Sequence, residues 1–303
     1  MSIFAEKSFA QGTGVDRAQF LAGATQPQSA YGPSATGEGV EDGRAASSPN
    51  DADIGQQEIL KRAPEYQPLT LSLGAPIFYT SNAALTPSGE ISDVIIAPVA
   101  AIYYDPRITR TLYLHVGGRE QLFYYGDNEA FDFGSLDADV GLNYFVPELN
   151  NLMLRVLYDF NRLTLNDRLG DEFFSNHTAI FNIELPMRFG RAQQVSFGAD
   201  ANISLAADHQ SPRRNDYEAY VGYTAALTRA LSFNAVGRVV LRDYHQNDRQ
   251  DVSEILSVTA TYRFTNWCSI SAISSFAHSD SNQSVFDYDV ANLGGAVAFT
   301  AKF

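Results

Sequence analysis

The stretch Val195-Ser-Phe-Gly-Ala-Asp-Ala-Asn-Ile-Ser-Leu205 alternates apolar residues with small or polar ones. Successive side chains of a β-strand point to opposite faces of the sheet, so a period of two gives one apolar face and one polar face. The stretch is about twice as long as the usual strand of roughly five to six residues. It therefore predicts one long strand with an apolar side and a small, polar side.

The same period runs from Leu69 to the C-terminus and predicts twelve strands, at residues 69–80, 91–104, 110–124, 132–146, 152–164, 177–189, 194–207, 216–227, 231–243, 252–264, 268–277 and 286–303. Their connections alternate between tight turns (147–151, 190–192, 228–230 and 265–267) and longer polar loops (166–176, 208–215, 244–251 and 278–284). Residues 94–104 are apolar at both parities, so the facing of the second strand stays open. The alternation predicts antiparallel neighbours whose two ends lie in different environments.

The composition excludes several classes of protein. Of the 303 residues, 18% are charged and 45% hydrophobic, and no run of about 18 apolar residues could form a membrane-spanning helix. The net charge of -14 opposes nucleic-acid binding, which needs a basic face. Cys268 is the single cysteine, and neither a zinc-like Cys/His spacing nor a glycine-rich phosphate loop is present. The sequence therefore predicts no intramolecular disulfide, no metal and no cofactor.

The strands of a soluble β-sandwich can also alternate apolar and polar residues, but three features favour a barrel that spans a membrane. They are the long strands, the alternating connections, and aromatic residues near the ends of the apolar stripes, where lipid headgroups would meet the wall. These aromatic residues are Tyr79, Tyr144, Phe160, Phe189, Tyr217, Phe233, Tyr262, Phe264, Phe276, Tyr288 and Phe303. The predicted fold class is all-β: a single closed antiparallel transmembrane β-barrel of about 12 strands over residues 67–303, preceded by an irregular N-terminal arm over residues 1–66.

The last predicted strand carries a more specific signal. One parity of this strand is apolar and ends on a terminal phenylalanine: Leu293, Val297, Phe299, Ala301 and Phe303. It resembles the C-terminal assembly signal of the Gram-negative outer-membrane β-barrel (porin-like) superfamily, and the resemblance covers residues 69–303 without indicating a subfamily. The resemblance implies an outer-membrane location, with barrel termini and short turns in the periplasm. It also implies membrane lipid, lipopolysaccharide and the barrel assembly machinery as partners, and no nucleic acid.

The polar parity of this barrel would face the lumen, because an arginine or lysine facing lipid near the midplane costs about 2 to 4 kcal/mol. We expect the lumen to be lined by Asp137, Asp139, Arg155, Asp159, Glu184, Arg188, Asp200, Glu218, Arg238, Arg242 and Arg263. We interpret them as an acidic wall facing an arginine-bearing wall along a hydrated pathway, which indicates a porin-like channel for small polar solutes or ions. The alternative is a set of ion pairs that fills a closed barrel with a structural or partner-binding role in an outer-membrane complex.

A membrane-embedded lipid hydrolase is the rival hypothesis from another class. His209-Gln-Ser211 is a His-x-Ser pair at a strand end, and Asn215 and Glu218 are nearby. The pair resembles the arrangement in outer-membrane phospholipases and lipid A deacylases, in which a histidine activates a serine. Three such residues arise easily by chance in a polar loop, and Pro212 interrupts the strand at once. We therefore predict no catalytic residues.

Residues 1–66 are rich in Gly, Ala, Ser, Gln, Pro and Asp, show no sustained period, and hold too few large apolar residues to fold alone. Pairing of Glu38, Glu41 and Asp42 with lumen arginines would make this arm a plug, but we favour a periplasmic tether or a contact with a periplasmic partner. A short helix is expected at 54–62. No export signal follows Met1, so an outer-membrane location implies that a signal was removed.

Overall fold

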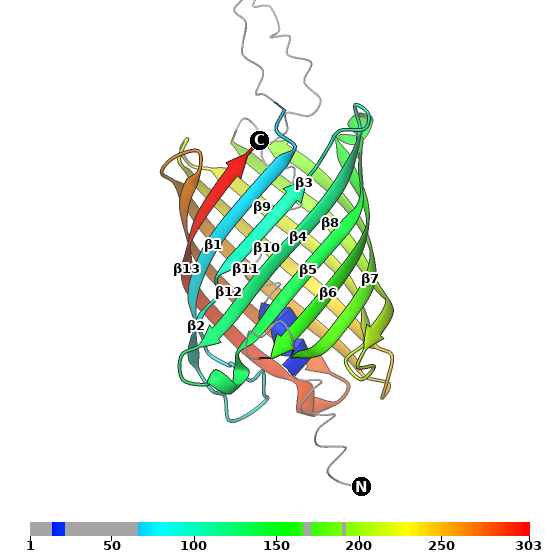
Figure 1. Ribbon diagram of the computed structural model, residues 1–303, viewed down its shortest axis with the longest axis vertical. Coiled ribbons are helices and arrows are strands. Elements are labelled where there is room, and N and C mark those ends of the chain that lie inside the picture. Colours follow the sequence, from blue (N-terminus) through cyan, green and yellow to red (C-terminus); the bar gives the residue numbers. More distant parts are fainter. Residues whose placement is uncertain (1–13, 22–65, 166–170, 190–191) are drawn as a thin grey trace, which may run out of the picture.

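The computed structural model describes residues 14–21, 66–165, 171–189 and 192–303. Its strands are β1 (Leu69–Thr80), β2 (Asp93–Ile96), β3 (Val99–Tyr104), β4 (Leu112–Tyr125), β5 (Phe133–Val146), β6 (Leu152–Leu165), β7 (Glu172–Phe189), β8 (Gln193–Asp208), β9 (Arg214–Ala226), β10 (Leu231–Tyr244), β11 (Gln250–Arg263), β12 (Cys268–Ser281) and β13 (Tyr288–Lys302). Short 3-10 turns lie at η2 (Glu129–Phe131), η3 (Pro147–Leu149) and η4 (Ser284–Phe286). β1 also pairs antiparallel with β13, so the sheet closes into a barrel (Figure 1).

β2 and β3 occupy one position in the wall. Both pair with β1 in a single register, with Ile77 opposite Ile96 and Gly74 opposite Val99. The interruption falls at Pro98, which has no backbone N–H to donate to the ladder. Thirteen strand segments therefore make twelve wall positions, the predicted number. Within β2, Ile95 is buried while Val94 and Ile96 are exposed, so the odd-numbered residues of this strand face inward.

The outer surface of the barrel is apolar, and the inner surface is mostly polar. Phe197, Val221 and Leu256 are 47%, 48% and 53% exposed on the outer face, whereas the inward neighbours Ser196 and Ser257 are buried. A closed barrel pairs every backbone donor and acceptor of its wall, which lets strands cross a bilayer. No described helix has the length and apolar character needed to span a membrane.

Several strands extend further than the period predicts on the side of the longer loops. β7 begins at Glu172, so the predicted loop is wrong for residues 172–176, and β12 continues to Ser281 rather than ending at residue 277. The extensions carry polar side chains such as Asn176 and Ser279, which resemble loop residues in sequence but belong to paired strands. Tyr288 also differs: it faces inward and is buried, instead of lying in the outer aromatic girdle.

Residues 14–21 form a helix inside the barrel, near the end that carries the longer loops (Figure 1). For these residues the expectation of an irregular conformation is wrong. The predicted helix at 54–62, and the acidic residues Glu38, Glu41 and Asp42, lie outside the described residues. β1 begins and β13 ends at the opposite end of the barrel, beside the short turns, and there Leu69 N donates to Phe303 O at 3.0 Å. We call the two ends the loop end and the turn end.

The orientation in the membrane gives a first testable prediction. In a Cys268→Ser background, single cysteines at Gln246 and Ser284, both exposed at the loop end, should react with an impermeant thiol reagent on whole cells. Cysteines at Glu148 and Arg229, exposed at the turn end, should react only after the outer membrane is permeabilised. The reverse pattern would invert the topology, and equal reaction of all four would contradict the barrel's placement across the membrane.

Candidate functional site in the barrel lumen

The loop end of the lumen is apolar on one side. Strands β1, β2, β4 to β7, β12 and β13 each point a buried apolar side chain inward close to this end. We call these residues the apolar collar: Phe78, Ile95, Phe123, Phe133, Leu163, Phe174, Ala277 and Val290. The rings of Phe123 and Phe133 stack with centroids 4.2 Å apart. The interior of a polar channel would not normally expose such a surface to water, so the collar needs a partner.

Helix 14–21 supplies that partner. Val15, Ala18 and Leu21 recur every three residues and so share one face of the helix, and all three belong to the same buried cluster as the collar. Phe20 packs edge-on against Tyr288, with ring centroids 6.1 Å apart. Arg17 lies over the Phe131 ring at 4.1 Å. A helix of this length is marginal in water, so its contacts with the wall hold it in shape.

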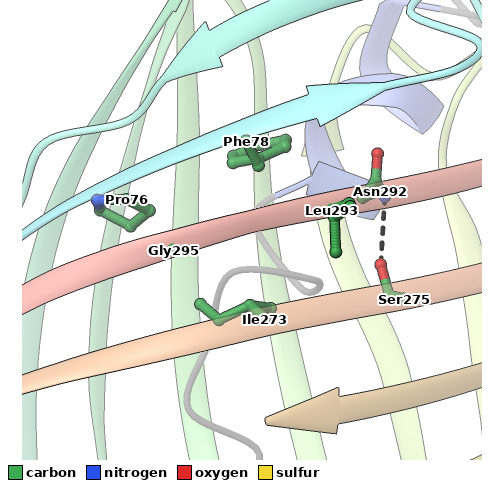
Figure 2. Close-up of a pocket in the computed structure, with 7 residues that line it drawn as sticks. All are labelled: Pro76, Phe78, Ile273, Ser275, Asn292, Leu293 and Gly295. Atoms are coloured by element: carbon green, nitrogen blue, oxygen red, sulfur yellow. Dashed lines mark hydrogen bonds between the residues drawn. The ribbon is translucent and has the colours of Figure 1, made fainter. Parts of the chain in front are cut away.

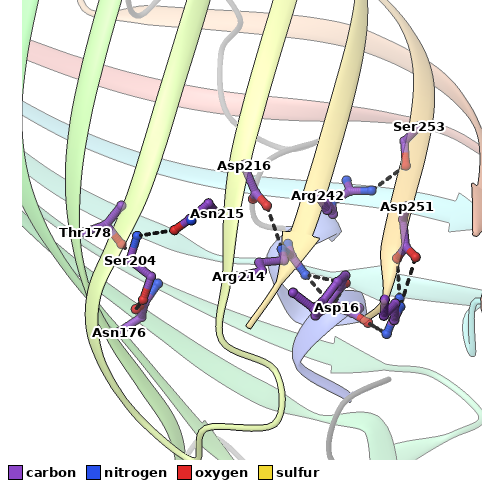
Figure 3. Close-up of polar contacts among 12 residues, drawn as sticks. Asp16, Asn176, Thr178, Ser204, Arg214, Asn215, Asp216, Arg242, Asp251 and Ser253 are labelled. Atoms are coloured by element: carbon purple, nitrogen blue, oxygen red, sulfur yellow. Dashed lines mark hydrogen bonds and ion pairs between the residues drawn. The ribbon is translucent and has the colours of Figure 1, made fainter. Parts of the chain in front are cut away.

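The opposite side of the lumen at this end carries arginines instead of apolar residues. Asp16 points from the helix toward them (Figure 3). Its carboxylate accepts a hydrogen bond from the Tyr244 hydroxyl at 2.7 Å and is paired with Arg214 and, at 3.0 Å, with Arg249. All three partners are buried, at 6%, 8% and 6% exposure. We call Arg214, Tyr244 and Arg249 the arginine clamp.

Wall carboxylates hold the clamp in place. Arg214 Nε donates to Asp216 at 2.8 Å, and Arg249 Nε donates to Asp251 at 3.0 Å. Arg249 also stacks on the Tyr244 and Phe286 rings, at 4.1 and 3.5 Å. Burial by itself lowers the pKa of Arg249, but the bond to Asp251 and the charge of Asp16 outweigh it, so this pKa lies above its ordinary value and the guanidinium stays charged. Several directed bonds therefore orient the clamp, and Arg249 within it stays cationic.

A polar cavity of about 190 Å³ lies beside the helix, within the lumen. Strands β5 to β9, the loop before β9 and the helix line it with Gln19, Ser135, Asp137, Asp159, Asn161, Asn176, Thr178, Ile180, Asn202, Pro212, Arg214 and Asp216. Asn161 donates to Asp137 at 2.7 Å, and Asn176 accepts from Ser204 at 2.6 Å. Carboxylates and amides dominate the lining, so the cavity suits water, hydroxyl groups and ammonium groups rather than an apolar ligand.

The predicted lumen-lining residues all lie on the inward parity of their strands. The structure brings Glu184, Asp200 and Arg155 near the middle of the barrel, where the Tyr220 hydroxyl donates to Glu184 at 2.8 Å and Arg155 donates to Asn143 at 2.6 Å. Asp139 is 2.7 Å from His115. Arg242 donates to Ser253. Arg188 and Arg263 stand apart, exposed at the turn end.

Oppositely charged pairs form where the predicted acidic strands meet arginine-bearing neighbours. Glu218 pairs with Arg238 of the adjacent strand at 3.6 Å, and Arg119 is the register partner of Asp137. Between these contacts acids also face acids across a ladder, as Asp200 does opposite Glu218. The expected division into an acidic wall facing an arginine wall stays a prediction.

The residues of the hydrolase hypothesis have other contacts. His209 has positive φ (64°), and its backbone N–H donates to Asp208 at 2.9 Å. Asn215, the candidate that would orient the histidine, accepts from Ser204 N at 3.0 Å and lies 3.2 Å from His245 instead. Glu218 forms an ion pair with Arg238. In the described part of the chain, no group of three or more His, Cys, Asp or Glu side chains has a metal-binding arrangement.

A second pocket lies where β1 closes onto β13, with β12 beside them (Figure 2). Pro76, Phe78, Ile273 and Gly295 line it, and the bond from Asn292 to Ser275, 3.1 Å long, crosses one edge. Its volume of about 20 Å³ holds a single water molecule at most. We therefore assign no solute to it.

Sequence reasoning missed the helix, the collar and most of the clamp. The spacing Val15, Ala18, Leu21 was a detectable signal, but it spans only two turns within a long irregular segment. Arg214 and Arg249 lie in or beside loops, where arginines are common and solvated. The clamp forms where β9, β10, the loop before β11 and the helix meet, and no local period reveals such a contact.

A closed antiparallel barrel of twelve wall positions with an apolar exterior and a polar lumen defines an outer-membrane β-barrel, and its fold is porin-like. The protein is located in the bacterial outer membrane. A model of the family described as "Putative beta-barrel porin 2" matches residues 177–300, which include β8 to β12 and most of β7 and β13.

Solved structures align with this chain at low sequence identity. The COG4313 outer membrane channel from Pseudomonas putida F1 aligns with a TM-score of 0.55 and 14% identity, over 78% of this chain and 98% of that one. The translocator domain of autotransporter NalP from Neisseria meningitidis aligns with a TM-score of 0.44 and 10% identity, over 78% of this chain and 89% of that one. No curated protein matches the sequence.

Proposed function

We propose that the protein is an outer-membrane channel for small polar solutes or ions and that helix 14–21 closes its loop end. The observation that carries this proposal is the polar cavity beside the helix, in the lumen of the barrel. A purely structural barrel gains little from such an interior, because buried charges and ion pairs are often less stabilising than apolar packing of the same volume. A transport pathway needs polar groups that replace the hydration of the solute.

The helix is suited to be a removable closure. Its contacts with the wall are hydrophobic packing, one carboxylate held by the clamp and ring contacts, all of which are reversible. The likeness to a solved outer-membrane channel supports the same class at the level of the fold. We propose no enzymatic activity, since Asn215 and Glu218 are engaged with Ser204, His245 and Arg238.

Ion current in planar lipid bilayers tests the proposal. The double substitution Val15→Asp and Ala18→Asp places two charges against the collar and should raise the time-averaged conductance several-fold above the wild type. Gln246→Asp combined with Ser284→Asp adds the same two charges at exposed positions of the loop end, away from the collar, and is the matched control that should change it little. If neither wild type nor double variant carries current while both migrate as folded barrels, the role is structural. Release of fatty acid from phospholipid vesicles would instead favour a hydrolase.

A further inference from the structure

The site that Asp16 occupies is built for a carboxylate. The clamp places two buried guanidinium groups and a tyrosine hydroxyl around one carboxylate, and each arginine is already aligned by its own wall acid. Arginine pairs carboxylates with directed, charge-assisted hydrogen bonds, so this arrangement selects that group over a neutral one. The clamp is therefore a carboxylate site that the protein fills with its own side chain.

The donors of the clamp show that the site is incomplete without an anion. Arg214 and Arg249 bond their own wall carboxylates through Nε, and each turns an Nη1 donor toward Asp16. The Tyr244 hydroxyl donates to the same carboxylate. If helix 14–21 left, these buried donors would lose their acceptor, and this is costly in a partly desolvated lumen. Another anion would lower that cost.

The collar adds a requirement for the remainder of the ligand. Val15, Ala18 and Phe20 flank Asp16 in the helix and pack in the same buried cluster as the apolar collar. A compound that replaces the helix must satisfy both halves, with a carboxylate at the clamp and an apolar body on the collar. A short carboxylate such as propionate leaves the collar bare, and an alcohol of the same shape leaves the clamp without its anion.

We infer that the arginine clamp and the apolar collar together form a binding site for organic carboxylates with an apolar body, which compete with helix 14–21 and open the loop end. This inference rests on the proposed channel function for its consequence, but binding and displacement of the helix are measurable without any current. The ligand acts by differential affinity, because it binds only the state in which the helix has left.

The experiment follows the accessibility of the helix. Val15 has no exposed surface, so Val15→Cys in the full chain with Cys268→Ser should react slowly with a thiol reagent. Adding 3-phenylpropionate should raise the labelling rate several-fold and saturably, whereas 3-phenyl-1-propanol and propionate at equal concentration should not. Ala18→Cys, at a second fully buried position, repeats the measurement in case the first cysteine itself loosens the helix.

The clamp is then tested by substitution. In Arg249→Gln, the increase caused by 3-phenylpropionate relative to the variant's own baseline should be lost. In Arg263→Gln, an exposed arginine at the turn end, it should be retained. Unchanged labelling in the parent protein at saturating 3-phenylpropionate would overturn the inference, as would an equal effect of the alcohol. The ligand-free bilayer currents described above decide the channel function separately.

Discussion

Asp16→Arg is expected to release helix 14–21 from the lumen and to give the largest rise in conductance of any single change in the helix. The substitution removes the carboxylate from two buried guanidinium groups and puts a third cation in its place. Breaking a buried ion pair from one side costs about 3 to 5 kcal/mol, so the equilibrium between the closed and open lumen should shift by about two to four orders of magnitude. Single-channel recording measures the open fraction directly.

Two further variants separate charge from packing in this prediction. Asp16→Asn keeps an acceptor for the Tyr244 hydroxyl and should open the lumen less than Asp16→Arg. Combining Asp16→Arg with Arg249→Asp restores one pair of opposite charges and should recover part of the closed population, a coupling that a double-mutant cycle quantifies. If Asp16→Arg leaves the conductance unchanged, and also leaves the rate at which Ala18→Cys reacts with the thiol reagent unchanged, the clamp does not hold the helix.

The wall of the barrel was predictable from the sequence because its determinant is local. One apolar parity facing lipid sets the side-chain direction of a whole strand, so β1, β6 and β10 begin at the predicted residues and end within one residue of prediction. The predicted strand boundaries are wrong where strands extend beyond the lipid-facing apolar stripe and the alternation of apolar and polar residues ends. Glu172, Ser175 and Asn176 extend β7 beyond the apolar stripe, and there only the pairing with β6 and β8 keeps them in a strand.

The interior was less predictable because it depends on contacts between distant segments. Parity places Glu218 and Arg238 on the inner face, but their pairing follows from the register of β9 against β10. Asp16 meets Arg214 and Arg249 across about two hundred residues of chain, and nothing in its own neighbourhood marks it. Phe78 and Phe174 on the inward face resemble ordinary apolar strand residues until the closed barrel puts them on one ring. The collar and the clamp therefore form only when the sheet closes into a barrel.

Arginine at Val221 is expected to impair assembly of the barrel strongly. Val221 lies near the middle of β9, is 48% exposed on the outer face, and is opposite Phe197 and Gly237 in the neighbouring strands. A lipid-facing arginine near the midplane costs about 2 to 4 kcal/mol. Ala201→Arg, on the outer parity of β8, should act in the same direction. The free energy of unfolding from lipid bilayers, with denaturant as the variable, measures both.

Asn202→Arg provides the matched control, because Asn202 directly follows Ala201 in β8 and faces the polar cavity. The added guanidinium would enter beside Asp159 and Asp216, two carboxylates of the same lining, so its charge is partly neutralised and remains hydrated. We expect its unfolding free energy to stay within about 1 kcal/mol of the wild type, as for most substitutions away from a packed core. A loss for Asn202→Arg as large as that for Val221→Arg would contradict the assignment of the two faces. The two substitutions introduce the same side chain on opposite faces of the barrel wall. The difference between their unfolding free energies therefore isolates the cost of placing arginine in contact with lipid.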